Sequence, residues 1–217
     1  MKKILWVLAL LLVVAPAFAG SVTPKVGLKA GLAMTNLTGD DADEMWGDEA
    51  PESKMGLAVG AFVGIPVGTL TIQPELLYVQ KGAKIEETIA SHEVKVTGKA
   101  DYLEIPVLCK FSFGETSAKP FFYVGPVLGI LMSAEYKEEI SGPVYNDSET
   151  TDIKDDSASM EFGLCLGAGV DVNKLSVELR YEMGMTSISD PEDWPDDLDK
   201  PDVKNTAIML MVGYAFN

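Results

Sequence analysis

From residue 25 onward, the chain alternates bulky apolar residues with small or polar residues at a period of two. Such alternation places successive side chains on opposite faces of a β-strand. In one segment, Phe162, Leu164 and Leu166 occupy one phase, while Gly163 and Gly167 occupy the other. Seven segments share this pattern, and an eighth, 120–134, is apolar on both faces. The eight segments are 25–37, 54–67, 70–81, 101–113, 120–134, 160–172, 175–186 and 205–216.

The second face of these segments is rich in Gly and Ala and carries a few charges in mid-strand. A soluble β-sandwich would instead cover its outer face with Lys, Glu and Thr. A small closed barrel has little internal volume and can hold polar side chains inside if they pair with one another. The bulky apolar face would then lie outside, against lipid.

Connections between the segments alternate between long and short. The long ones are 38–53, 82–100, 135–159 and 187–204, and the other three are brief. We therefore predict an all-β, eight-stranded, antiparallel up-and-down transmembrane β-barrel, with short periplasmic turns and long acidic extracellular loops. A girdle of aromatic residues is expected near the periplasmic end, formed by Phe111, Phe113, Phe121, Phe122 and Phe216.

The first 19 residues have the features of a cleaved export signal. Lys2 and Lys3 precede an apolar run over 4–14, and Ala17 and Ala19 are the small residues that a signal peptidase reads. The run is too short to cross a bilayer comfortably. We expect residues 1–19 to be a signal peptide and residues 20–217 to be one outer-membrane barrel domain.

Acidic residues concentrate in the long connections, which hold 25 of the chain's 33 acids against seven lysines. The formal net charge of −16 leaves no basic footprint for nucleic acid. Segment 187–204 resembles a calcium-binding loop in charge only, because it lacks the spacing and the glycine of such a loop. We interpret it first as a solvated acidic loop, and weak divalent-cation binding is the alternative. Its candidate residues are Asp190, Glu192, Asp193, Asp196, Asp197 and Asp199.

Six charged residues share the predicted interior face. Buried charges must pair or change protonation. They could form a structural plug or line a narrow polar pore. Because the interior of eight strands is just filled by side chains, the plug is favoured. The six residues are Lys29, Glu75, Glu104, Lys110, Glu178 and Arg180.

The sequence offers few groups for catalysis. Its one histidine, His92, lies between Ser91 and Glu93, but neighbours in a strand point to opposite faces, so adjacency does not make a nucleophile–base pair. We interpret His92 as an exposed loop residue. Cys109 and Cys165 lie on opposite-phase faces of non-adjacent segments, which disfavours a disulfide. No catalytic residue, cofactor or formed metal site is expected.

Several short motifs give the chain a family resemblance. They are KVGLKAGL at 25–32, QPELLYVQKG at 73–82, YLEIPVL at 102–108, FYVGP at 122–126, GAGVD at 167–171 and GYAFN at 213–217. In this order and spacing, the chain resembles the PorT-like family of small outer-membrane β-barrels. One departure is that the last aromatic residue, Phe216, is penultimate. The resemblance implies the fold and the location, and it implies no shared catalytic residues.

The expected function is that of a non-enzymatic outer-membrane barrel with a filled interior, acting in envelope structure or through its acidic loops. Expected partners are outer-membrane lipid and lipopolysaccharide, the barrel-assembly and periplasmic chaperone machinery, and weakly bound divalent cations. A lipid-modifying enzyme, a narrow pore and a soluble periplasmic lipocalin-like carrier are the alternatives. The carrier would reverse the two faces, with an apolar cavity and a polar exterior.

The signal and the barrel pattern predict where the protein is found. In fractionated cells, the mature chain should sediment with the outer membrane and require detergent for extraction. It should also show the heat-modifiable migration of a folded barrel. Recovery in the soluble periplasmic fraction without detergent would contradict this expectation.

Overall fold

A computed structural model describes residues 23–39, 41, 52–89, 92–114, 117–141, 146–154, 157–189 and 201–217. The export signal and the candidate cation-binding residues 190–199 lie outside this described part of the chain. Within it, no helix is long and apolar enough to cross a membrane.

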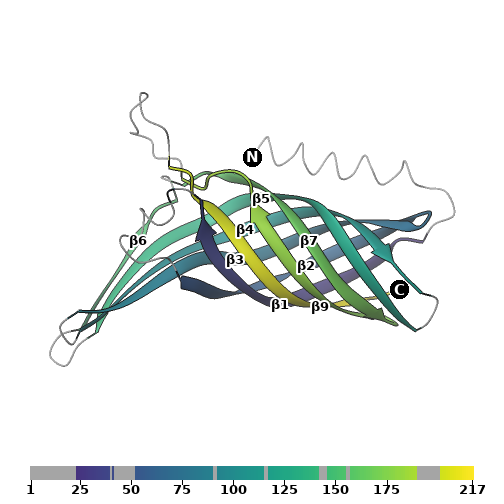
Figure 1. The fold of residues 1–217 in the computed structure, drawn as a ribbon, viewed down its shortest axis with the longest axis horizontal. Helices are drawn as coiled ribbons and strands as arrows, with labels where there is room; N and C mark the ends of the chain where they lie inside the picture. Colours follow the sequence, from purple (N-terminus) through teal and green to yellow (C-terminus); the bar gives the residue numbers. More distant parts are fainter. Residues whose placement is uncertain are drawn as a thin grey trace.

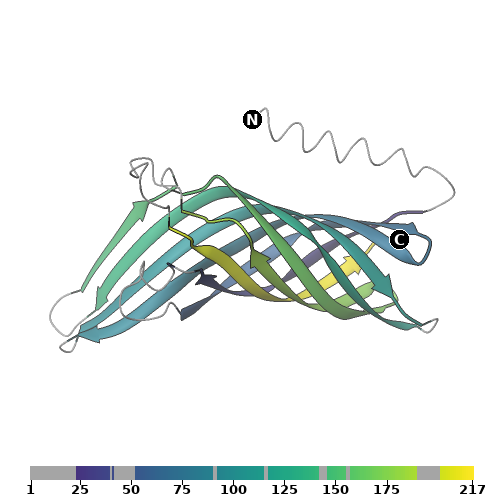
Figure 2. The same ribbon diagram turned by 45° about the horizontal axis from the view of Figure 1, so that its top comes forward.

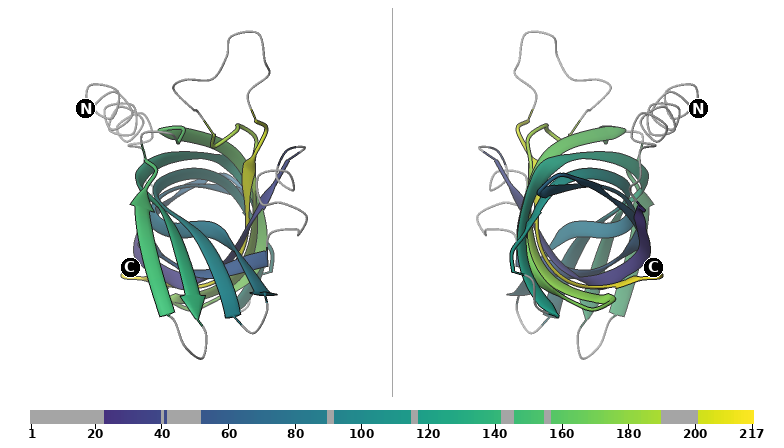
Figure 3. Two further views of the ribbon diagram at one scale, coloured as in Figure 1. Left: turned by 90° about the vertical axis from the view of Figure 1, so that its left-hand side faces the viewer. Right: turned by 90° about the vertical axis from the view of Figure 1, so that its right-hand side faces the viewer.

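The described residues form nine antiparallel strands. Eight of them close a ring in the order β1-β2-β3-β4-β5-β7-β8-β9, in which β4 pairs with β5 and β9 returns to β1 (Figures 1 and 3). The predicted eight-stranded up-and-down barrel is confirmed. The strands are β1 (Lys25–Thr38), β2 (Glu52–Val67), β3 (Leu70–Ile89), β4 (His92–Ser112), β5 (Ala118–Ser141), β6 (Asn146–Asp152), β7 (Met160–Val172), β8 (Leu175–Gly184) and β9 (Lys204–Ala215).

Both ends of the described chain lie at the end of the barrel that carries the short turns (Figure 1). The Asn217 side chain accepts a hydrogen bond from the Val26 amide and donates one to the Pro24 carbonyl. Two of the turns there need a left-handed residue, supplied by Gly68 (φ 62°) and Asn173 (φ 57°). Glycine and asparagine tolerate this conformation better than other residues do.

The two faces of the strands are divided as the alternation predicts. Along β8, Leu175, Val177 and Leu179 are exposed, and the residues between them are buried. The same division holds on β1, β2, β7 and β9, so apolar side chains cover the outside of the ring. This exterior is the reverse of the one expected for a soluble carrier.

Aromatic side chains gather at the short-turn end, with one exception to the predicted girdle. The Phe122 ring stacks on Phe111 at 4.8 Å and on Phe113 at 5.5 Å between centroids, on the outside of the barrel. The prediction for Phe121 is wrong, because this side chain faces the interior and is 3 % exposed. Segment 120–134 is apolar on both faces, so its pattern did not reveal which residues point inward.

Two of the segments interpreted as loops contain strand, which corrects the prediction. In 82–100, β3 continues to Ile89 and β4 already begins at His92. In 135–159, β5 continues to Ser141 and is followed by β6. Together these parts of β3, β4, β5 and β6 form a four-stranded sheet that projects beyond the ring, which we term the extension (Figure 2).

Ion pairs along the surface help to hold the extension together. The Glu86 carboxylate accepts contacts from Lys95 Nζ at 2.8 Å and from Lys84 Nζ at 2.9 Å. Two hydrogen bonds, of which the one from Lys95 has the larger effect and the one from Lys84 the smaller, lower the pKa of Glu86 to about 2. Such exposed pairs contribute little each. The extension continues the strand pairing of the barrel. Its edge strand, β6, consists of polar residues that are all exposed.

The assigned facing makes a depth-dependent prediction. Leu179→Arg would place a charge against lipid in mid-strand, which costs about 2–4 kcal/mol, whereas the same change near an interface costs about 0–1 kcal/mol. Leu175→Arg is the matched control, because it lies on the same face at the first residue of β8. Folding into lipid vesicles should suffer much more from Leu179→Arg. Equal folding yields for the two variants would contradict the assignment of Leu179 to the lipid-facing side of β8.

Candidate functional site: the barrel interior and its outer mouth

Four of the six predicted interior charges meet in one buried cluster, which we term the lower cluster. Lys29 Nζ lies 2.6 Å from Glu75 Oε1 and 2.8 Å from Glu178 Oε2. Arg180 Nη2 lies 2.6 Å from Glu75 Oε2 and 3.2 Å from Glu178 Oε1. Each cation therefore contacts both carboxylates, and two positive charges balance two negative ones. The strands β1, β3 and β8 supply these residues from separate parts of the ring.

Tyr123 completes the lower cluster from β5. Its hydroxyl accepts a hydrogen bond from Arg180 Nε at 3.0 Å and donates one to Glu178 Oε1 at 3.1 Å. Space for the phenol comes from β7, because a Cβ added at Gly167 would overlap the Tyr123 ring. Glycine on the inner face thus makes room for the large side chains that fill the barrel.

A second buried cluster, the upper cluster, lies nearer the long-loop end and has more acids than bases. Lys81 Nζ lies 2.7 Å from Glu104, 3.3 Å from Glu161 and 2.7 Å from Glu182. Three carboxyl groups surround one ammonium group, so the formal charges do not cancel.

The remaining interior charge lies near the short-turn end. Lys110 Nζ is 2.9 Å from Asp171 Oδ2 and 3.6 Å from the centroid of the Phe121 ring. Apolar side chains fill the space around these polar layers, forming one group that includes Leu77, Met209 and Met211 and another that includes Leu108. Between a cavity of about 210 Å³ at the short-turn end, which reaches Lys29, and a larger one at the long-loop end, the interior is occupied by paired charges and packed side chains.

The structure thus places all six predicted residues inside the barrel but divides them among three groups. Four lie in the lower cluster, Glu104 lies in the upper cluster, and Lys110 pairs with Asp171. Lys81, Asp171 and Glu182 lie on the inward-facing phase of their segments, but the predicted network of six did not include them. Sequence reasoning missed Glu161 and Tyr123 altogether. Glu161 lies two residues before Gly163, so extending the alternation by one step could have found it.

The other candidate groups have no assembled site in the described part of the chain. His92 begins β4, which corrects its assignment to a loop, and its side chain is not among those described. Cys109 and Cys165 are free. Among the described residues, no three His, Cys, Asp or Glu side chains are arranged to hold a metal ion. In the upper cluster, the Lys81 ammonium group occupies the place between the carboxylates.

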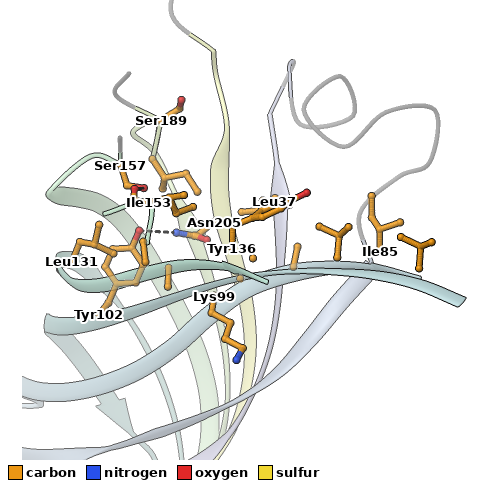
Figure 4. Close-up of a pocket in the computed structure, with 18 residues that line it drawn as sticks. Leu37, Ile85, Lys99, Tyr102, Leu131, Tyr136, Ile153, Ser157, Ser189 and Asn205 are labelled. Atoms are coloured by element: carbon orange, nitrogen blue, oxygen red, sulfur yellow. Dashed lines mark hydrogen bonds between the residues drawn. The ribbon is translucent and has the colours of Figure 1, made fainter. Parts of the chain in front are cut away.

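A cavity of about 500 Å³ opens above the upper cluster, at the long-loop end (Figure 4). Its walls are apolar and come from both the ring and the extension; they include Leu37, Ile85, Leu131, Ile153 and Ile188. Tyr102 and Asn205 form the floor, where Asn205 Nδ2 donates to the Tyr102 hydroxyl at 3.3 Å. Sequence reasoning could not find this cavity, since one wall belongs to strands that were interpreted as loops.

Comparison with known proteins assigns the family. Residues 23–190 match the family described as outer membrane protein beta-barrel domain, which is more than half of the chain. The chain therefore belongs to this family and is an outer-membrane β-barrel protein. No curated protein sequence matches it.

Three solved structures are similar to the chain. Ail, the attachment invasion locus protein of Yersinia pestis, is 14 % identical with a TM-score of 0.40, over 89 % of this chain and 99 % of that one. Neisserial surface protein A is 14 % identical with a TM-score of 0.43, over 88 % and 97 %. The outer-membrane enzyme PagL is 14 % identical with a TM-score of 0.43, over 86 % and 98 %.

The lower cluster predicts a large and non-additive cost of substitution. Arg180→Met would leave Glu75 and Glu178 without one of their two cations, and breaking a buried ion pair costs about 3–5 kcal/mol. In urea unfolding from lipid vesicles, the double variant Arg180→Met with Glu75→Gln should lose less stability than the two single variants added together, by ~1–3 kcal/mol. Additivity within about 0.5 kcal/mol would show that the two side chains are not coupled.

Proposed function

We propose that the protein is a non-enzymatic outer-membrane barrel with a closed interior, whose function is performed at its extracellular end. The main support for this proposal is the filling of the middle of the barrel, between the cavities at its two ends. Among the described residues, two clusters of buried charges and the packed apolar side chains around them separate the two cavities. Solute passage is therefore disfavoured relative to a role in surface interaction.

A lipid-modifying activity is the alternative that the family leaves open. Such an enzyme needs a nucleophile and a base close to each other. The sequence has one histidine, and His92 lies in the hairpin of the extension rather than beside the buried carboxylates. The buried carboxyl groups contact Lys81, Lys29 or Arg180, which suits pairing rather than proton transfer to a substrate.

The extracellular end offers two surfaces for interaction. One is the extension, whose polar edge strand β6 is fully exposed. The other is expected from the long connections, whose sequence concentrates acidic residues that repel one another. We propose that Ca²⁺ or Mg²⁺ binds these loops weakly and diffusely, through residues such as Asp190, Asp193 and Asp197, and ties them to the anionic headgroups of lipopolysaccharide.

The remaining expectations about partners and processing are part of the same proposal. Export would use the signal at residues 1–19, and insertion would use the periplasmic chaperones and the barrel-assembly machinery. The motifs that end with GYAFN at 213–217 support membership of the PorT-like group within the wider family.

Electrical recording and lipid analysis test the closed, non-enzymatic barrel. Purified folded protein should add no steps of conductance to a planar bilayer, because side chains fill the middle of the barrel. The mass spectrum of lipid A should be the same in cells that produce the wild type, the His92→Ala variant or no protein. Discrete channel openings would contradict closure, and a lipid A product lost in His92→Ala would establish the enzyme instead.

Protease protection tests the cation proposal. Millimolar Ca²⁺ should slow cleavage within 38–53 and 187–204 in outer-membrane vesicles, while leaving the unfolding of the barrel almost unchanged, since its ladder closes without the loops. Replacing Asp190, Asp193 and Asp197 by Asn should remove most of the protection. Unchanged cleavage rates with and without Ca²⁺ would overturn the proposal.

A further inference from the structure

We propose that the cavity at the outer mouth binds an amphipathic cation, a molecule with an apolar body and one ammonium group. This inference rests on the proposed function only in placing the mouth on the extracellular side. The apolar body would occupy the cavity, and the ammonium group would lie at the floor, above the upper cluster.

The walls define the apolar half of the ligand. Leu37 and Ile188 belong to an apolar group on one side of the mouth, and Leu131 and Ile153 belong to another group across it. Their backbones are fixed by hydrogen bonds, such as those from the Ile188 amide to Val203 and from the Ile153 amide to Ala134. A volume of about 500 Å³ lies within the range of small-molecule sites.

The floor supplies a hydrogen-bond acceptor. Asn205 is 1 % exposed, and its amide orientation is set by donation from Nδ2 to Glu161 Oε2 at 2.8 Å and to the Tyr102 hydroxyl. Among the described residues, nothing donates to Asn205 Oδ1. A buried acceptor without a donor costs free energy, so a ligand that donates to it is favoured.

The charge below the floor selects a cation. Glu161 accepts a hydrogen bond from the Asn205 side chain. It belongs to the upper cluster, in which three carboxyl groups surround the Lys81 ammonium group. With three carboxyl groups around one ammonium group, the upper cluster has a formal excess of negative charge. Lys99, which also lines the mouth, is exposed and points away from the cavity (Figure 4).

Other head groups satisfy only part of these requirements. A hydroxyl group could donate to Asn205 Oδ1 but would leave the excess charge uncompensated. A carboxylate would meet both an acceptor and a like charge. The acidic residues of the long connections at this end of the chain's strands would also raise the local concentration of cations.

Three probes that differ only in the head group test the proposal. They are 2-phenylethylamine, 2-phenylethanol and 3-phenylpropionate, titrated into the full mature protein in lipid nanodiscs, with empty nanodiscs as the blank. The amine should bind at least ~10-fold more tightly than the alcohol, a difference of about 1.4 kcal/mol, and the carboxylate should not bind. Equal affinities, or preference for the carboxylate, would overturn the proposal.

Ala134→Phe tests the role of the apolar cavity, and Glu161→Gln tests the role of the charge below its floor. Ala134→Phe, on the buried wall, should abolish binding of the amine, whereas Ala168→Phe, the same change on the lipid-facing side of β7, should not. Glu161→Gln should reduce the preference for amine over alcohol to less than ~3-fold. If Ala134→Phe loses heat-modifiable migration, Ile188→Phe tests the opposite wall. Binding that survives filling of the cavity would place the amine elsewhere and refute the site, whereas the closed barrel is tested separately by conductance.

Discussion

The interior of this barrel can hold charged side chains only because they pair with one another. The lipid-facing side of each strand takes the bulky apolar residues, so every charge placed in mid-strand must point inward. Removing such charges from water is costly, and the cost is recovered only with close partners and additional hydrogen bonds. The lower cluster meets this condition, because Lys29 and Arg180 each contact Glu75 and Glu178.

Because side chains fill the middle of the barrel, we place the function of the protein at its outer end. Glycines on the inner face let the strands close around large polar side chains, as Gly167 does for Tyr123. The ladder then continues beyond the ring through β3, β4 and β5, and β6 adds an outer edge. The same continuation supplies one wall of the mouth cavity. The same strands therefore close the barrel and form the external binding surface.

The sequence predicted the barrel well, since alternation, short turns and strand count depend on local pattern. It also identified six of the charges that point inward, because facing follows directly from the phase of a strand. It could not group them, since contacts such as Lys81 to Glu161 join β3 to β7 and depend on register across the ring. Polar residues over 82–100 resembled a loop, and only pairing with β5 shows them to be strand. The mouth cavity was hidden for the same reason.

The most direct test of a closed interior uses a residue that the protein already has. Cys165 is fully buried on the inner side of β7, where it lies opposite Glu182 on β8 and Gly125 on β5. In a Cys109→Ala protein in lipid nanodiscs, the rate at which a charged, membrane-impermeant thiol reagent modifies Cys165 would be measured before and after unfolding. The closed barrel predicts no modification until the protein unfolds. Modification of the folded barrel at a rate approaching that of the unfolded chain would show a water-filled interior and contradict the account.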